Sequence, residues 1–258
     1  MTHAHAQLGR IAASIGTGAA VLLCGTVLCA QAPSTSDIVA RMQQAQHEVV
    51  PQAYQSVRRY EVFRRDGQHP HTEIVAQVDY VPPGQKSYEI KSSTGGMGER
   101  AIRHALDHEV DLTREPEKVE FNERNYDFAL VGSDDCEWIQ RPCYLLQATP
   151  KRSDQDLLKS KIWVDAETFR IMRVQGSPSK SPSFWIKDLD LTIDFGEIGG
   201  VWTRTVTRAE AQVRFSGAYT VLAHTVSMQP DNVVAAKRAP AAKRHRASVM
   251  AASAIRIR

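Results

Sequence analysis

FWIKDLDLTIDF, residues 184–195, decides the fold class, because its side chains change character at every second position. The odd positions from 189 to 195 are apolar: Leu189, Leu191, Ile193 and Phe195. The even positions from 188 to 194 are polar: Asp188, Asp190, Thr192 and Asp194. A period of two predicts a strand with one packed face and one wet face, as in antiparallel sheets.

Other stretches share this period. HTEIVAQVDYV (residues 71–81) alternates in the same way, as does VWTRTVTRAEAQVRF (residues 201–215). In the second stretch Trp202 has the parity of Arg204 and Arg208, which predicts that it lies on the polar face or at a rim. Turn-forming sequences separate about nine or ten such strands. Two segments, residues 34–50 and 98–112, instead have helical spacing. We therefore expect a mainly β (α+β) fold, a long antiparallel meander with about two helices.

The N-terminus indicates export. One cation, Arg10, precedes an apolar run that ends in small residues, which is the pattern of a secretory signal peptide. We expect cleavage after Ala30, so that residues 1–30 are the signal peptide. The alternative is an uncleaved membrane anchor. Residues 31–230 then form one domain of ordinary size, and residues 231–258 form a basic tail that we expect to be disordered.

Charge divides the chain unevenly. The net charge is +3 overall, with +6 in residues 231–258 and −4 in residues 31–230. A mildly acidic domain with a basic tail does not indicate nucleic-acid binding, and we expect none. For the tail, weak attraction to anionic membrane surfaces is the alternative to plain disorder.

Cys136 and Cys143 are the two cysteines outside the predicted signal peptide. In an oxidising compartment two such cysteines favour a disulfide. A metal site needs about four ligands, which the neighbouring sequence does not supply. A redox dithiol usually has the C-x-x-C spacing, whereas six residues separate this pair. We therefore predict a disulfide at the base of a β-hairpin.

The strongest enzymatic motif is HALDH, residues 104–108. On a helix His104 and His108 lie four positions apart and can face one metal ion, with Asp107 or Glu109 nearby. Asp107 stands where the inverted zinc-protease pattern requires Glu, and charged neighbours favour a solvated helix face. The chain has no nucleophile elbow and no phosphate-binding loop of the usual types. We expect no enzyme, no cofactor and no metal, with a zinc hydrolase using His104 and His108 as the weaker alternative.

Three motifs carry a family resemblance. They are Asn125–Phe128 (NYDF), Ile162–Asp165 (IWVD) and Pro182–Trp185 (PSFW). With their surroundings, about residues 120–228, they resemble the outer-membrane lipoprotein-sorting-protein-like family with LolA/LolB-like folds, in its environmental-bacterial branch. The resemblance implies an unclosed antiparallel half-barrel whose concave apolar face is covered by about two helices. It also implies non-catalytic holding of a lipid or an acyl chain in the periplasm.

We therefore expect a periplasmic carrier that holds a lipid or the acyl chains of a lipoprotein. We expect it to be a monomer. The partners expected are an outer-membrane receptor or a membrane protein. The expected lipid-binding side chains are Trp163, Trp185, Phe195 and Tyr80, and Trp202 is a further candidate. The main alternative is an envelope sensor or adaptor that binds a membrane-protein partner with the same fold. The location expected is the periplasm, with membrane association as a further expectation.

Overall fold

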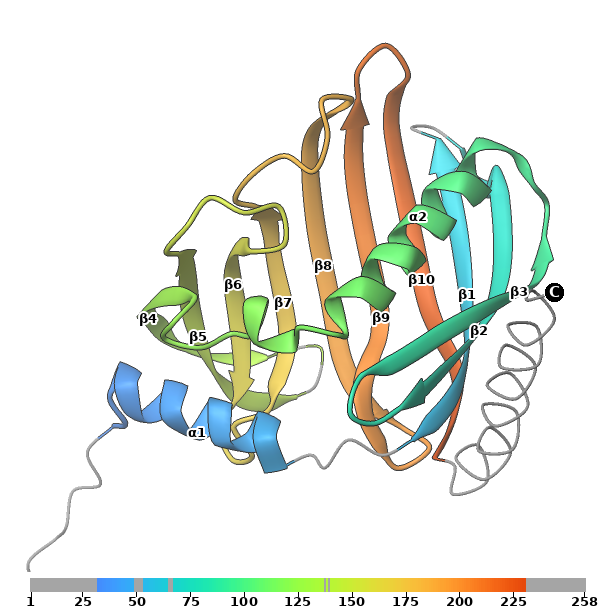
Figure 1. Ribbon diagram of the computed structural model, residues 1–258. Coiled ribbons are helices and arrows are strands. Elements are labelled where there is room, and N and C mark those ends of the chain that lie inside the picture. The colour runs from blue at the N-terminus through green and yellow to red at the C-terminus, as the bar shows by residue number, and fades with distance from the viewer. Residues whose placement is uncertain (1–31, 49–52, 65–66, 137, 139, 231–258) are drawn as a thin grey trace, which may run out of the picture. The chain divides into compact units, whose positions relative to one another are not determined.

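The computed structural model describes residues 32–48, 53–64, 67–136, 138 and 140–230 (Figure 1). Contacts divide the chain into two compact units, Met1–Ala32 and Pro33–Arg258, and every element described below belongs to the second. The predicted signal peptide and the predicted basic tail lie outside the described residues, so both stay predictions. Within the described part of the chain, no helix is long and apolar enough to cross a bilayer.

The second unit is built on a ten-stranded antiparallel sheet with the strand order β3-β2-β1-β10-β9-β8-β7-β6-β5-β4. Its strands are β1 (Tyr54–Arg64), β2 (Thr72–Val81), β3 (Gln85–Ser93), β4 (Tyr126–Cys136), β5 (Arg141–Pro150), β6 (Leu158–Asp165), β7 (Ile171–Pro178), β8 (Ile186–Ile198), β9 (Val201–Val213) and β10 (Gly217–Pro230). Strands β3 and β4 are its two edges, so the sheet is not closed. Its helices are α1 (Thr35–Glu48), α2 (Gly96–Leu112) and the short 3₁₀ helix η1 (Pro116–Lys118). The predicted fold class is confirmed.

Strand register shows that one face of the sheet is continuous from β1 to β5. Residues directly opposite each other in neighbouring strands point to the same face. One such row crosses seven strands: Tyr60, Ala223, Thr207, Ile193, Val174, Ile162 and Leu146. Tyr60 lies in the apolar cluster that contains α2, and Leu146 lies in the cluster that contains α1. Both helices therefore cover the same face, which we call the inner face.

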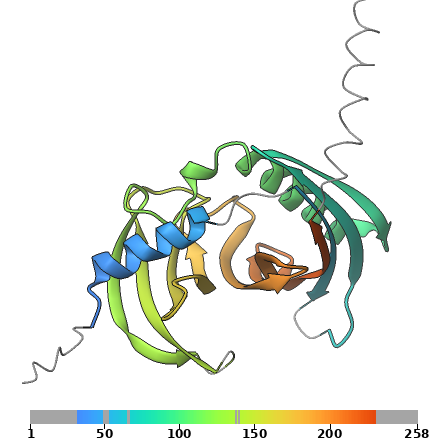
Figure 2. The same cartoon turned by 90° about the horizontal axis from the view of Figure 1, so that it is seen from below.

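Each helix covers one wing of the sheet, and Figure 2 shows the two wings on either side of strands β8 and β9. Helix α1 buries Ile38, Val39 and Met42 in a cluster with residues of β4–β7. Helix α2 buries Ile102 and Leu106 against β1 and β2. Apolar side chains at a spacing of three or four residues thus give each helix one buried stripe. The core is split in two, and the central strands between the clusters are only half-buried.

The stretch that predicted the fold class has the predicted orientation. Ile193 and Phe195 pack on the inner face against the cluster under α1. On the outer face Asp194 forms an ion pair with Arg173, and Asp190 accepts a hydrogen bond from Ser177. The alternation of Leu and Asp along β8 therefore separates a packed face from a solvated face, as expected for an antiparallel sheet.

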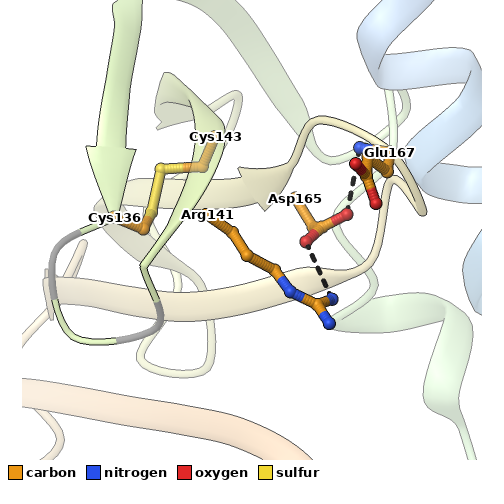
Figure 3. Close-up of a disulfide and its surroundings, with 5 residues drawn as sticks. All are labelled: Cys136, Arg141, Cys143, Asp165 and Glu167. Carbon is orange, nitrogen blue, oxygen red and sulfur yellow. Dashed lines mark hydrogen bonds and ion pairs between the residues drawn. A yellow bond between two sulfur atoms is a disulfide. The ribbon is translucent and has the colours of Figure 1, made fainter.

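Cys136 and Cys143 form the predicted disulfide, with 5.9 Å between their Cα atoms. The bond joins the end of β4 to the start of β5, and both cysteines are buried (Figure 3). Beside it, the carboxylate of buried Asp165 lies 3.6 Å from the guanidinium of Arg141 and accepts hydrogen bonds from the backbone N–H groups of Glu167 and Thr168. The disulfide therefore closes a hairpin whose second strand leads into the cluster under α1.

Opening this ring should destabilise the protein. For the double variant Cys136→Ala/Cys143→Ala we expect the free energy of unfolding to fall by about 2–3 kcal/mol, because the unfolded chain regains the freedom of a short loop. Urea denaturation of both proteins measures the difference. A reductant should shift the wild-type midpoint in the same direction and leave that of the variant unchanged. If the reductant does not change the wild-type midpoint, the disulfide does not stabilise the fold.

Candidate functional site

A cavity of about 1090 Å³ opens on the inner face, beside the last turns of α1 and the β8–β9 hairpin. Its apolar lining includes Phe121, Ile171, Phe195, Val201 and Trp202. Its polar lining includes Tyr54, Tyr80, Arg170 and Arg204. Apolar walls with a few polar groups are typical of pockets that bind small molecules, and this cavity lies at the upper end of their size range.

The β8–β9 hairpin that borders the cavity turns at Gly199 and Gly200, which have φ angles of 59° and 77°. These positive values are accessible to glycine at little cost. A Cβ atom on Gly199 would also lie only 2.1 Å from the carbonyl oxygen of Met228. The sequence EIGG therefore allows the tight return of β9 along β8 and its close approach to β10.

An irregularity in β9 brings Trp202 and Arg204 into the cavity. Ile193 on the inner face pairs with Thr207, and Asp194 on the outer face pairs with Val206. After a register shift, Phe195 on the inner face pairs with Arg204, so that Thr205 is an extra residue. Such a bulge reverses the alternation of the side chains that follow it. Trp202 and Arg204 line the cavity, whereas Arg208 pairs with Glu210. The prediction, made from parity, that Trp202 lies on the same face as Arg208 is therefore wrong.

Two of the four predicted lipid-binding side chains, Tyr80 and Phe195, line the cavity. Tyr80 stacks on Tyr54, with 5.2 Å between the ring centroids. Trp163 pairs in register with Arg173, and the guanidinium of Arg173 is bound to Asp194 on the outer face. Trp163 therefore lies on the outer face, against Trp138.

Trp185, the fourth predicted side chain, immediately precedes β8 and is 58% exposed. It lies at the start of β8, whereas the cavity takes residues from the other end of that strand. The structure thus brings Tyr80, Phe195 and Trp202 to one cavity and places Trp163 and Trp185 elsewhere.

Four charged side chains, which we call the Glu109 cluster, meet beside the cavity. They are Arg58 from β1, Lys86 from β3, Glu109 from α2 and Arg204 from β9. The carboxylate oxygen Oε1 of Glu109 accepts hydrogen bonds from Arg58 Nη1 at 2.9 Å, Lys86 Nζ at 2.6 Å and Arg204 Nη2 at 2.6 Å. The side chains of Arg58 and Lys86 are each only 8% exposed. Glu109 thus holds α2 to three strands of the sheet.

Burial and mutual attraction shift the pKa values in the Glu109 cluster. Burial by itself raises the pKa of Glu109, but the charges of Arg204, Arg58 and Lys86 outweigh it and hold this pKa well below its usual value of 4.5. Burial lowers the pKa of Lys86 to about 8, and Glu109 offsets only part of that decrease. The cluster therefore has one carboxylate, ionised at neutral pH, among three cations.

The side chains of the HALDH motif have separate surroundings in the structure. His108 lies 2.7 Å from a carboxylate oxygen of Asp156, and His104 is exposed on the surface of α2. Asp107 accepts a hydrogen bond from the hydroxyl of Tyr88, and Glu109 is bound by the three cations. Among the residues that the structure describes, no three His, Cys, Asp or Glu side chains form a group that could hold a metal ion.

This chain is similar in fold to several solved structures, at low sequence identity. No protein-family model matches the chain, and no curated protein matches its sequence. A DUF1329 family protein from Desulfovibrio piger is 16% identical, with 78% of this chain and 95% of that chain covered, at a TM-score of 0.44. A chain described as an outer membrane lipoprotein-sorting protein domain, from Vibrio parahaemolyticus, is 9% identical over 75% and 92%, also at 0.44.

A LolA superfamily protein from Nitrosomonas europaea is 13% identical, with 78% of this chain and 95% of that chain covered, at a TM-score of 0.38. The lipoprotein-sorting group that the sequence resembles is thus among the structural neighbours.

The Glu109 cluster should make stability depend on pH. Glu109→Gln leaves three cations around a neutral amide, so we expect the free energy of unfolding at pH 7 to fall by about 3–5 kcal/mol. Because the pKa of Glu109 is lower in the folded state, its contribution is present above about pH 4.5 and is lost as the pH falls below that value. Urea denaturation at a series of pH values measures both effects.

Exposed Glu73 on β2 provides the matched control for this prediction. Glu73→Gln should change the free energy of unfolding at pH 7 by less than about 0.5 kcal/mol, as is usual for surface substitutions. It should also keep the acid dependence of the wild-type protein between pH 4.5 and pH 3. Equal losses in the two variants would show that Glu109 does not anchor α2.

Proposed function

We propose that this protein is an exported, non-catalytic binding protein that holds a lipid, or the acyl chains of a lipoprotein, in the inner-face cavity. The proposal rests on one observation, which is that apolar side chains of the central strands are only partly buried. Phe195 and Trp202 line a 1090 Å³ cavity and are only half-buried, whereas the apolar residues under α1 and α2 are almost fully buried. Apolar surface left accessible in a concave site is what an apolar ligand would cover.

The binding energy would come from removing the ligand's methylene groups from water. Each buried methylene contributes about 0.8 kcal/mol, so a chain of several methylenes in this cavity supplies the affinity of a carrier. The side chains that we expect to contact it are Tyr80, Phe195 and Trp202, and Ala45 of α1 lines the same cavity. Helix α2 is held by the Glu109 cluster, whereas α1 is held mainly by three buried side chains, so displacement of α1 is the simpler route for ligand entry and release.

Location and partners belong to the same proposal. We place the protein in the periplasm, with a membrane or an outer-membrane receptor as the acceptor of its ligand. Residues 1–30, on which export depends, lie outside the described residues. The second candidate function, an envelope sensor or adaptor, predicts instead that a membrane protein copurifies while the cavity holds no lipid.

A variant that fills the cavity should test this function. Ala45→Trp places an indole in the cavity wall, whereas Ala40→Trp places one on the exposed side of the same helix. If the indole takes the place of two methylene groups of the ligand, the binding free energy falls by about 1.6 kcal/mol. We therefore expect about tenfold less copurifying lipid with Ala45→Trp and no change with Ala40→Trp. Mass spectrometry of lipids extracted from protein purified from its native envelope measures the difference.

Two results of this experiment would contradict the proposal. One is a wild-type protein without copurifying lipid. The other is an equal amount of lipid in the two variants, which would place the lipid outside the cavity. Circular dichroism and the unfolding midpoint of each variant establish beforehand that α1 keeps its place.

A further inference from the structure

The Glu109 cluster contains more positive charge than its own carboxylate can neutralise. Arg58, Lys86 and Arg204 together carry three positive charges, and Glu109 carries one negative charge. Arg58 and Lys86 are more than nine-tenths buried, so water compensates little of this excess. Buried charge without a partner is costly, and structures usually supply a counter-charge. Within the described residues, the Nε atom of Arg58 also lacks a hydrogen-bond acceptor.

Arg204 connects this charge to the cavity. Its Nη2 atom donates to Glu109, while its side chain lines the cavity and is 38% exposed. In the described structure its other guanidinium nitrogens donate no hydrogen bond, so they are free to bind a ligand. A guanidinium presents donors in a planar fork that matches a carboxylate or a phosphate. Tyr54 and Tyr80 line the same cavity, and a tyrosine hydroxyl can donate a hydrogen bond to an anion.

Other charges at the cavity do not cancel this excess. Glu48 and Glu197 line the cavity but are exposed, so solvent screens them. Arg170 is the other lining cation, and its guanidinium lies 5.1 Å from the centre of the Trp202 ring. Mixed charges therefore occupy the solvent-exposed rim, and the positive excess lies in the buried part.

We propose that the cavity selects ligands with an anionic head group, a carboxylate or a phosphate, which binds Arg204 while the apolar chain lies along Phe195 and Trp202. This proposal rests on the proposed lipid-binding function and specifies its ligand class. A neutral lipid of the same chain length would leave the charge of the cluster uncompensated and would bind more weakly.

Three probes with one chain length test the proposal: dodecanoate, dodecyl phosphate and dodecanol, each below its aggregation limit, with binding followed by tryptophan fluorescence at pH 7. A hydrogen bond to a charged group contributes about 1.5–3 kcal/mol, so an anion should bind on the order of 10- to 100-fold more tightly than dodecanol. A preference for dodecanoate or for dodecyl phosphate identifies the head group.

Arg204→Gln should abolish the preference for anions while dodecanol binding changes little. Arg208→Gln is the matched control, because Arg208 pairs with Glu210 and does not line the cavity. Arg204→Lys keeps the charge and should keep most of the preference, which provides a second variant if Arg204→Gln does not fold. Equal binding of the three probes by the wild type would overturn the anionic ligand and leave the proposed function standing. Binding of none of them would overturn both.

A second, independent feature lies at the opposite end of β8. Phe184, Trp185 and Phe215, which we call the aromatic tip, are 70%, 58% and 94% exposed. Their rings contact one another in edge-to-face geometry, with centroid distances of 5.5 Å and 6.4 Å. Arg214 fixes the two segments together, because its Nε atom donates to the carbonyl oxygen of Phe184 at 2.8 Å and its backbone N–H donates to that of Trp185 at 2.8 Å.

Phe215 has a φ angle of 65°, a conformation that favours glycine and is unusual for a bulky side chain. A bulky side chain held in this strained conformation at an exposed turn indicates that the aromatic ring itself is needed there. The two segments of the tip, residues 180–187 and 213–217, contain Lys180, Lys187 and Arg214 and no acidic residue, although Asp188 directly after them lies 3.9 Å from the ammonium group of Lys187. Exposed aromatic rings flanked by cations suit the interface of an anionic bilayer.

We infer that the aromatic tip docks on the surface of a membrane that contains anionic phospholipids. Flotation with vesicles of phosphatidylcholine and phosphatidylglycerol should recover the wild-type protein, whereas pure phosphatidylcholine vesicles should recover much less. Phe215→Ser should weaken binding on the order of tenfold, as expected for one buried aromatic side chain. Met97→Ser removes another exposed apolar side chain, at the start of α2, and should have no effect.

Photo-crosslinking identifies what contacts the aromatic tip. A photo-reactive phenylalanine replaces Phe215 in cells that make the full chain, and the molecules crosslinked to it are analysed. Lipid adducts support the membrane. Adducts with another protein, or with a second copy of this chain, would overturn it and assign the tip to a protein interface. Equal flotation of Phe215→Ser and Met97→Ser would also overturn it.

Discussion

The carboxylate of Glu109 is the point at which helix α2 is held to its own wing and to the central strands. It binds cations from β1, β3 and β9, and β3 and β9 are four strand spacings apart in the sheet order, about 19 Å along a flat sheet. Long side chains from both directions therefore converge on one helix. This arrangement fixes α2 over its wing, and it directs Arg204 to the edge of the cavity. The same buried charges that fix the helix thus give the cavity its electrostatic character.

The division of the core into two clusters lowers the stability of the fold and leaves apolar surface accessible. Each helix covers its own apolar cluster, and the apolar side chains of the strands between them pack only at the edges of these clusters and stay half-buried. A single helix packed on β8–β10 would bury that surface and stabilise the fold, at about 25 cal/mol per Å² of apolar area. The protein leaves this area accessible in the cavity that Phe195, Trp202 and Ala45 line. An unclosed sheet with a divided core is therefore suited to holding something that is not part of the chain.

The sequence predicted the architecture but only part of the site, and particular residues show why. The Leu–Asp alternation of residues 188–195 predicts which face of β8 is solvated, and the structure confirms this prediction. Trp163 lies in a run of apolar neighbours, Ile162 and Val164, where parity does not show which side faces inward. Trp202 was misassigned because one extra residue, Thr205, reverses the alternation and leaves no mark in the sequence. The Glu109 cluster escaped prediction because its members lie 23 to 95 positions from Glu109, a distance over which local patterns carry no information.

The order of strands has a consequence for how the chain reaches its folded state. Strand β1 pairs with β10, so the wing that contains β1–β3 and α2 joins the rest of the sheet only through the last strand. Strands β4–β9 are neighbours in sequence and can assemble from local contacts, whereas the β1–β10 ladder spans most of the described chain. Contacts of such long sequence separation form slowly. A growing chain therefore cannot complete the sheet before β10 has been made, even where β4–β9 have already paired with one another.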